Sequence, residues 1–411
     1  MTRAILYIYN ASFGLEETLT VTGLTALPGT GYPHWASCKW MGASNTGITE
    51  DFAHYAAGQG ADGAFTGVPL VYLLDGIADG TNKEWYDETG APTEDAVHTD
   101  WNERDPIDVA TDWISQSNNG KRQDMVVESA SSGGIPASGA HSTAVCAKTE
   151  GVMDPTSTTK VNTSTALVSS GVQVDPLGLD ASGDTVPVRF MRPRASYDDI
   201  SVSELDGTNY FIRALMTGSQ GINIIAGWVE VLCVDTQPGT IEWVHFSRGA
   251  ADGSGYFCGL NTATGGLPAD ITARTGETQF LNGGYCYRAN RNKASPACTV
   301  QLGNAAGRNG NTVQGQAMSM CYRPNGVVTG AGVLMACRFG TGGGPQFEAY
   351  VVPSGGANKA GIYETGVQKA LGTYTIPTTD VTYLVFVVEQ ETAAATVFGR
   401  PSLMGMSPGI I

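Results

Sequence analysis

The stretch that decides the fold class reads Val381-Thr382-Tyr383-Leu384-Val385-Phe386-Val387-Val388. Its residues are β-branched or aromatic and are apolar on both alternating faces, which is typical of a strand covered on both sides. We therefore predict a central strand over residues 381–389. A chain that builds its core around such a strand needs further strands beside it, and the rest of the sequence supplies them.

Short apolar stretches with strand character recur along the whole chain between glycine-rich joints. Tyr210, Ile212, Ala214 and Met216 alternate with other residues and would share one face of a strand. The 54 glycines suit tight turns, because glycine accepts a positive φ at little cost. Further strands are predicted over residues 3–9, 17–22, 68–74, 165–174, 185–191, 209–216, 222–235, 241–247, 279–289, 312–323, 327–339, 346–352 and 395–403.

This pattern predicts an all-β protein of antiparallel β-sandwich or jelly-roll type. A chain of 411 residues exceeds what one core usually supports, so we expect two or three domains. We place them at residues 1–125, 126–249 and 250–411. The stretch 118–145 is rich in Asn, Ser and Gly and is predicted to be an exposed boundary loop.

A few short helices are predicted in the N-terminal region. Residues 49–57 begin with Thr49 as an N-cap, followed by Glu50 and Asp51 in the first turn, and Gly58 follows as a stop. Residues 105–114 begin with an Asp cap and Pro106 at the first helical position, followed by helical spacing of apolar residues.

Charge is unevenly distributed along the chain. The net charge is −16 overall, and residues 1–125 hold 18 acidic and 6 basic side chains. Residues 271–340 hold seven basic side chains and one acid, Glu277. The acidic total argues against nucleic acid as a partner. The opposite signs would suit packing between copies of the chain, although separate domains with separate surfaces explain them equally simply.

Twelve acids gather in the first segment: Asp75, Asp79, Glu84, Asp87, Glu88, Glu94, Asp95, Asp100, Glu103, Asp105, Asp108 and Asp112. A solvated acidic face is the favoured interpretation. The alternatives are a calcium ion held in an acidic loop and a carboxylate pair that hydrolyses a glycan. The loop beginning at Asp75 lacks the ligand order of an EF-hand, so a calcium site is a weaker expectation than a solvated acidic face. No other cofactor is predicted.

Catalytic motifs are missing from the sequence. It contains no G-x-S-x-G, no Walker motif and no C-x-x-C, and its five histidines stand apart from one another. The G-x-G-x-x-G at 58–63 is interpreted as a turn. We therefore predict a non-enzymatic protein. The beginning of the chain lacks the features of a signal peptide, and no apolar stretch is long enough for a membrane helix, so we expect synthesis in the cytoplasm and mostly reduced, buried cysteines.

Aromatic and basic residues interleave in the last segment and form the candidate recognition surface. Flat aromatic faces with guanidinium and amide donors suit sugar binding, whereas ordinary loop chemistry would explain the same composition. The candidate residues are Tyr285, Tyr287, Arg288, Arg291, Arg308, Tyr322 and Arg323.

Taken whole, the chain resembles virion structural proteins of tailed bacteriophages, of fibre, spike or decoration type. The resemblance is carried by the low lysine content, the abundance of Gly, Thr, Ser and Asn, and phrases such as residues 185–194 and 398–403. It implies a homo-oligomer, such as a trimer, that contacts other virion proteins and host polysaccharide. A jelly-roll coat protein and a glycan-binding or glycan-degrading protein stay open as alternatives.

Overall fold

The computed structural model describes residues 2–26, 33–39, 48–59, 68, 70–89, 96–101, 113–133, 135, 144–155, 161–169, 172–173, 180–182, 188–193, 211–216, 222–234, 241–244, 271–273, 285–290, 299–302, 315–339 and 345–390. These residues form four β-sheets, and every strand pair described is antiparallel. One 3-10 helix, η1 (His98–Asp100), and no α-helix occur among them. The prediction of an all-β fold is therefore confirmed for the described residues. No helix in the described part is long and apolar enough to span a membrane.

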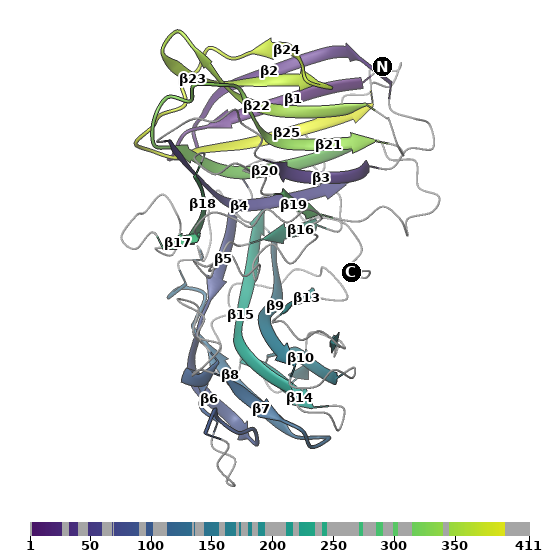
Figure 1. Cartoon of the computed structure of the whole chain (residues 1–411), viewed down its shortest axis with the longest axis vertical. Coiled ribbons are helices and arrows are strands. Elements are labelled where there is room, and N and C mark those ends of the chain that lie inside the picture. The colour runs from purple at the N-terminus through teal and green to yellow at the C-terminus, as the bar shows by residue number, and fades with distance from the viewer. Residues whose placement is uncertain are drawn as a thin grey trace.

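Two of the sheets form the upper body in Figure 1. The upper eight-stranded sheet has the order β17–β18–β4–β20–β25–β1–β2, and β16 also pairs with β4. Its strands are β17 (Ile271–Ala273), β18 (Tyr285–Asn290), β4 (Thr49–Gln59), β20 (Gly315–Pro324), β25 (Thr382–Gln390), β1 (Thr2–Tyr9), β2 (Leu15–Leu24) and β16 (Ile241–Val244).

The upper six-stranded sheet shares one hydrophobic core with the eight-stranded sheet. Its order is β19–β3–β21–β22–β23–β24. The shared core includes Leu6 from β1, Phe386 from β25 and Phe347 from β22. The strands are β19 (Thr299–Leu302), β3 (Pro33–Lys39), β21 (Gly332–Phe339), β22 (Gln346–Ser354), β23 (Ala357–Glu364) and β24 (Val367–Leu371).

The lower body contains the other two sheets, one with six strands and one with five (Figure 1). The lower six-stranded sheet contains β11 (Val172–Gln173), β10 (Val161–Ser169), β14 (Phe211–Met216), β8 (Arg122–Val127), β6 (Gly76–Lys83) and β12 (Asp180–Ser182). The lower five-stranded sheet contains β13 (Val188–Pro193), β9 (Ala144–Pro155), β15 (Ile222–Val234), β5 (Leu70–Leu74) and β7 (Ile114–Gln116). Their shared core is built around Trp85 and Trp101.

The strand predicted from residues 381–389 is a central strand, β25, between β1 and β20. Leu384, Phe386 and Val388 enter the upper core. Val385 and Val387, on the opposite face, are also buried. A strand covered on both faces is what its doubly apolar sequence predicts.

The helix predicted over residues 49–57 is wrong, because this segment is β4. Glu50 and Asp51 looked like acids of a first helical turn, but they face partners on β20 that lie 272 residues away. Tertiary pairing here overrides the local helix signal. Residues 105–112 of the second predicted helix lie outside the described residues, and Ile114 begins β7 instead.

Part of the predicted boundary loop is also a strand. Residues 122–127 form β8, which lies between β14 and β6 in the lower six-stranded sheet. Its pattern places Gln123, Asp124 and Met125 in buried positions. The polar residues that suggested a loop are used inside the fold. The proposed segments 1–125, 126–249 and 250–411 remain a prediction, and the upper eight-stranded sheet draws strands from all three.

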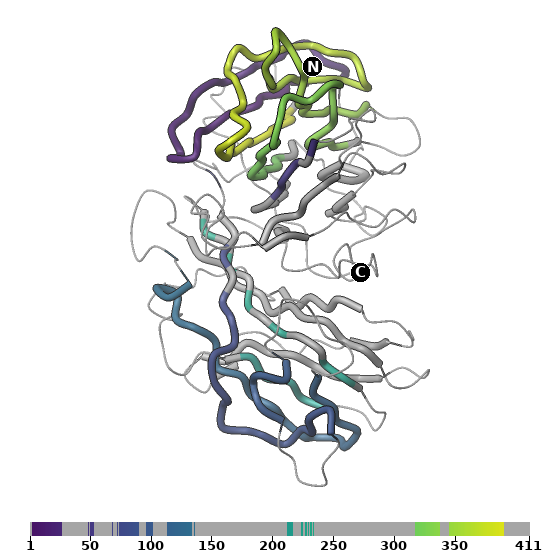
Figure 2. Tube along the Cα trace, turned by 60° about the vertical axis from the view of Figure 1, so that its left-hand side comes forward, coloured from purple at the N-terminus to yellow at the C-terminus, as the bar shows by residue number. Residues whose placement is uncertain are grey.

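The two bodies are joined by a cluster of buried aromatic and sulfur-containing side chains at the waist. Tyr72 of β5, Tyr383 of β25 and Cys321 of β20 belong to the same core cluster as the lower body. Phe13, in the turn between β1 and β2, packs against this cluster, with its ring centroid 4.8 Å from that of Tyr383. Figure 2 shows the two bodies from a second direction.

Candidate functional site

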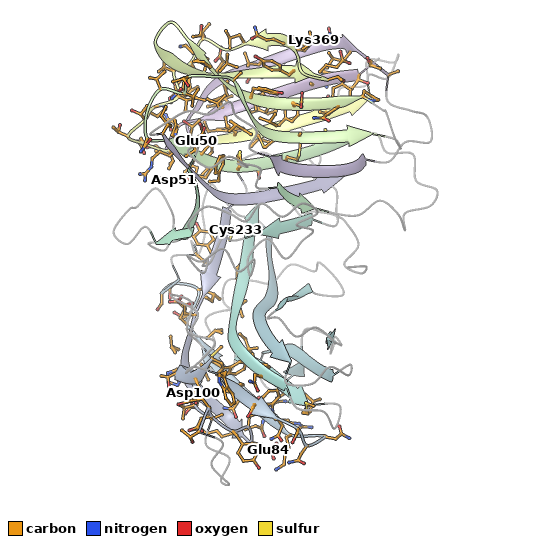
Figure 3. All side chains as sticks on the ribbon, in the orientation of Figure 1. Glu50, Asp51, Glu84, Asp100, Cys233 and Lys369 are labelled. Atoms are coloured by element: carbon orange, nitrogen blue, oxygen red, sulfur yellow. The ribbon has the colours of Figure 1, made fainter. Side chains whose placement is uncertain are left out.

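Two buried polar pairs, one on each face of the sheet and together called the β4–β20 cluster, lie where β4 pairs with β20. The Tyr322 hydroxyl donates to Glu50 Oε1, and Arg323 Nη2 lies 3.1 Å from Asp51 Oδ2. Tyr322, Glu50 and Asp51 are almost fully buried, and Arg323 is only 9% exposed. Figure 3 places Glu50 and Asp51 on β4 in the upper body. The cluster therefore binds two strands together across the sheet.

The structure separates the predicted recognition residues into three groups. Tyr322 and Arg323 are buried in the cluster on β20, so they do not lie on an exposed surface. Tyr285, Tyr287 and Arg288 lie on β18, where Arg288 is in register with Asp51 of β4. The remaining two, Arg291 and Arg308, lie outside the described residues.

The basic segment, residues 271–340, includes β20 and β21, which lie inside the two upper sheets, and also β17, β18 and β19, which lie at one end of them. β17 and β18 end the upper eight-stranded sheet, and β19 ends the six-stranded sheet. In Figure 1 these strands lie at the waist, close to the lower body. The opposite ends of the two sheets, β2 and β24, lie farthest from the lower body. The predicted recognition segment is therefore placed near the middle of the molecule rather than at an extremity.

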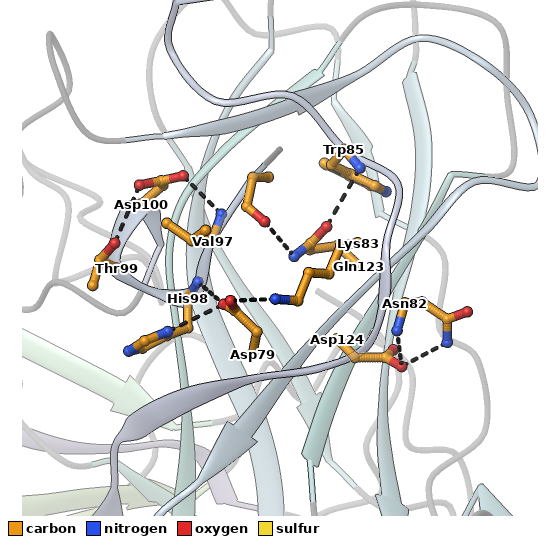
Figure 4. A network of polar contacts seen from close by, with 11 residues as sticks. Asp79, Asn82, Lys83, Trp85, Val97, His98, Thr99, Asp100, Gln123 and Asp124 are labelled. Carbon is orange, nitrogen blue, oxygen red and sulfur yellow. Dashed lines mark hydrogen bonds and ion pairs between the residues drawn. The ribbon is translucent and has the colours of Figure 1, made fainter. Parts of the chain in front are cut away.

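Described acids of the acid-rich segment, among them Asp79 and Asp100, take part in a network of hydrogen bonds within the chain (Figure 4). Asp79 accepts from the His98 backbone amide, lies 3.1 Å from His98 Nδ1, and accepts from Lys83 Nζ at 2.7 Å. Burial disfavours the charged form of Asp79. The hydrogen bonds from Lys83 and His98 outweigh this, so the pKa of the carboxyl lies below its usual value.

Buried polar residues of β8 hold the same segment from the inside. Asp124 accepts two hydrogen bonds from Arg213, at 2.7 and 2.9 Å, and one from the Asn82 amide nitrogen at 2.6 Å. The Gln123 side chain donates to the Ala96 carbonyl at 3.0 Å and accepts from the Trp85 backbone amide at 3.4 Å. These contacts tie Asn82, Trp85 and Ala96 to the sheet.

Asp100 has the opposite electrostatic setting from Asp79. It accepts from the Val97 amide at 2.9 Å and closes η1. Partial burial raises its pKa, and the negative charges of Glu88 and Asp87 raise it further. Figure 3 shows Asp100 and Glu84 at the lower end of the molecule.

The calcium alternative gains no support from the described acids. No group of three or more His, Cys, Asp or Glu side chains within the described ranges is arranged to hold a metal ion. Asp79, Glu84 and Asp87 accept hydrogen bonds from neighbouring side chains or backbone amides. Glu94, Asp95, Glu103, Asp105, Asp108 and Asp112 lie outside the described residues.

The waist contains buried groups with perturbed ionisation. Burial raises the pKa of Tyr72, with a further contribution from Cys233. Burial likewise raises the pKa of Tyr383 well above its usual value, and Cys321 adds to the effect. No disulfide joins Cys233, Cys321 or Cys337, and all are buried. For these cysteines the prediction of buried thiols is confirmed.

A pair of tyrosines on the outer face of the upper six-stranded sheet was not predicted from the sequence. Tyr350 and Tyr363 stack with ring centroids 3.9 Å apart and an interplanar angle of 19°. The buried Glu348 lies beside them and accepts from the Gly366 amide at 2.9 Å. A usable signal was the alternation of these residues with the core residues Phe347, Ala349 and Val351.

The described side chains thus form four features: the buried polar contacts between β4 and β20, the hydrogen-bonded acids of the lower body, the aromatic core between the two bodies, and the outward-facing pair of Tyr350 and Tyr363. In comparisons with known proteins, the chain matches no family model, no curated protein and no solved structure.

Proposed function

We propose that this chain is a non-enzymatic structural component of a virus particle of the tailed-phage kind, assembling as a closed homo-oligomer such as a trimer. The observation that supports a structural role most directly is the waist. Tyr72, Tyr383 and Cys321 belong to a core cluster that includes residues of both bodies. A packed core resists bending because close-packed side chains cannot slide independently. A long, stiff β protein suits a structural subunit that transmits force between neighbouring proteins of a particle.

The use of the charged side chains supports the same proposal. Asp79, Asp124 and Asp51 each bond to cations or amides of the same chain. Carboxylates held in this way stabilise loops and strand pairs, and they are poorly placed to exchange protons with a substrate. The proposal therefore gives them an architectural role.

The paired sheets support a finer proposal about the fold. Each body contains two antiparallel sheets that contribute to a common core. We propose that each body is a β-sandwich of jelly-roll type. Two such bodies in one chain also favour the alternative of a coat protein, because a double jelly roll needs two sandwiches of this kind.

The state of assembly tests the proposal. Mass photometry and electron microscopy of the purified chain should show a closed oligomer of a few copies. A large shell would favour the coat protein instead. A strict monomer at tens of micromolar, in the absence of any particle, would contradict both.

The basic end of the upper body is the proposed contact between copies or with other virion proteins. The double variant Arg288→Ala with Arg291→Ala should weaken assembly, and raising salt above about 0.15 M should weaken assembly of the parent, because screening acts on exposed charges. The matched control is Lys359→Ala with Lys369→Ala, which removes two cations from the opposite end. Equal assembly of the Arg288/Arg291 variant and the parent across this salt range would contradict the assignment.

A further inference from the structure

The outer face of the upper six-stranded sheet carries a flat aromatic platform. Phe347, Ala349 and Val351 of β22 point into the core, so the alternating residues Glu348 and Tyr350 point outward. Tyr350 is half-buried, whereas Tyr363 is 8% exposed. Because Tyr363 lies against one face of Tyr350 at 3.9 Å, the exposed part of Tyr350 is held in a fixed orientation.

The backbone beneath the platform allows this packing. Gly361 of β23 lies in register with Tyr350. A Cβ atom at Gly361 would lie 3.2 Å from Tyr363 Cε2 and 3.1 Å from the Ala370 carbonyl oxygen. Glycine therefore lets the Tyr363 ring lie close to the strand. The platform is built into the sheet and does not depend on a loop.

Polar groups border the platform on two sides. The Tyr363 hydroxyl donates to Gln368 Oε1 at 2.9 Å, which fixes the amide of an exposed side chain on β24. On the other side, the half-buried Gln346 donates through its amide to Glu348 Oε1. Each amide nitrogen carries two N–H donors, and these contacts orient both amides at the edge of the rings.

We propose that this platform, centred on Tyr350 with Gln346 and Gln368 at its borders, binds a neutral saccharide. Sugar rings present C–H faces that pack on an aromatic ring and hydroxyls that bond to side-chain amides. The buried carboxylate of Glu348 beside the rings disfavours anionic ligands. The inference deepens the proposed function, on which it rests for a biological setting, by naming a ligand class and a second surface far from the basic segment.

Isothermal titration of the full chain with maltohexaose, cellohexaose and chitohexaose tests the proposal. We expect at least one hexasaccharide to bind. Tyr350→Ala should lower that affinity about tenfold or more, as is typical for a central aromatic contact. Tyr350→Phe keeps the ring and should bind within about threefold of the parent. Tyr7→Ala is the matched control, because Tyr7 is a half-buried tyrosine on the outer face of the other upper sheet.

Binding of none of these saccharides, or equal binding by the parent and by a folded Tyr350→Ala variant, would overturn the proposal. If Tyr350→Ala does not fold, the comparison of Gln368→Ala with the parent replaces it, with a loss of about threefold expected for an exposed amide. Assembly is measured on the same samples by mass photometry. An oligomer that binds no hexasaccharide would overturn this inference alone, and a monomer that binds one would overturn the assembly proposal alone.

Discussion

The two bodies are stabilised in different ways. In the upper body, strands from the two ends of the described chain lie side by side, and β1 pairs with β25 from Thr2 opposite Gln390 to Tyr9 opposite Tyr383. Its core is built from apolar side chains, and its buried polar side chains, such as Glu50 and Asp51, join strands that are already paired. In the lower body, the buried polar side chains Gln116, Gln123 and Asp124 of β7 and β8 hold residues 82–85 and Ala96, which lie outside these two strands.

This difference predicts where each body is vulnerable. Hydrophobic cores lose stability in proportion to the volume removed, and neighbouring side chains partly fill the space. A buried polar group that loses its partner bears its full desolvation cost, because no water can replace the lost bond. Polar substitutions should therefore cost most where the side chain is fully buried and bonded to several partners, as Asp124 of the lower body is, and least at partly exposed pairs such as Arg3 and Glu389 of the upper body.

Asp124→Ala should have the largest effect. It would leave Arg213 without its bidentate partner and remove the acceptor of Asn82. Breaking a buried ion pair from one side costs about 3–5 kcal/mol, and the 23% exposure of the Arg213 side chain places this pair at the lower end of that range. We expect a loss of that size in the free energy of unfolding, together with faster hydrogen exchange in residues 82–98. Urea titration followed by hydrogen exchange and mass spectrometry would measure both.

The control for Asp124 is Glu389→Ala in the upper body. Glu389 pairs with Arg3 across β1 and β25 at a partly exposed position. Such pairs are worth about 0–1 kcal/mol. If Glu389→Ala destabilises the protein as much as Asp124→Ala does, the burial of Asp124 does not explain its contribution to stability.

Tyr322→Phe should have an intermediate effect in the upper body. It removes the hydroxyl that donates to the buried Glu50 and leaves the ring in place against Phe52, with a centroid distance of 5.3 Å. Loss of a hydrogen bond to a buried charged group costs about 1.5–3 kcal/mol, and thermal unfolding would detect it. Tyr363→Phe, whose partner Gln368 is exposed, should change stability by less than about 1 kcal/mol. Equal losses of stability in the two variants would show that the hydrogen bond from Tyr322 to Glu50 contributes no more than an exposed one.

The sequence predicted much of the fold where the side-chain pattern agrees with the local backbone. β25, β1 and β15 were predicted nearly to their observed bounds because their apolar residues follow a strand period. β4 was missed because Thr49, Glu50 and Asp51 also fit a helix start, and the deciding partners, Tyr322 and Arg323, are distant in sequence.

The two hairpins formed by β22, β23 and β24 were missed for a different reason, because the turns that join these strands were overlooked. Gly355 and Gly356 adopt φ values of 60° and 77°, and Thr365 and Gly366 adopt 49° and 78°. Two successive positive values fit the type I′ turn of a tight hairpin, for which Gly-Gly is a favoured pair. These turns would have predicted β23 and β24. Because a two-residue turn fixes the register of its hairpin, they would also have predicted that Tyr363 lies opposite Glu348, next to Tyr350.

The smallest expected effect distinguishes two carboxyls of the same acidic segment by sign. The pKa of Asp79 lies below its usual value in the folded protein, so its charge contributes stability at pH above about 4 that is lost as pH falls through the folded pKa. The pKa of Asp100 is raised. Its charge therefore opposes folding at neutral pH, and that penalty disappears as the pH falls towards the ordinary aspartate pKa of about 4.

At pH 7, Asp79→Asn should destabilise the protein and Asp100→Asn should stabilise it slightly, each by a few tenths of a kcal/mol to about 1 kcal/mol, since both sites are partly exposed and screened. Because an asparagine oxygen can still accept from the Val97 amide, the Asp100 substitution changes the charge while keeping the η1 contact. Paired urea titrations of the two variants at pH 7 and pH 4 would measure the difference. Shifts of the same sign at pH 7 would mean that the acidic segment behaves as a uniform solvated surface, and the contrast between an internally bonded lower end and an apolar upper core would then not extend to its electrostatics.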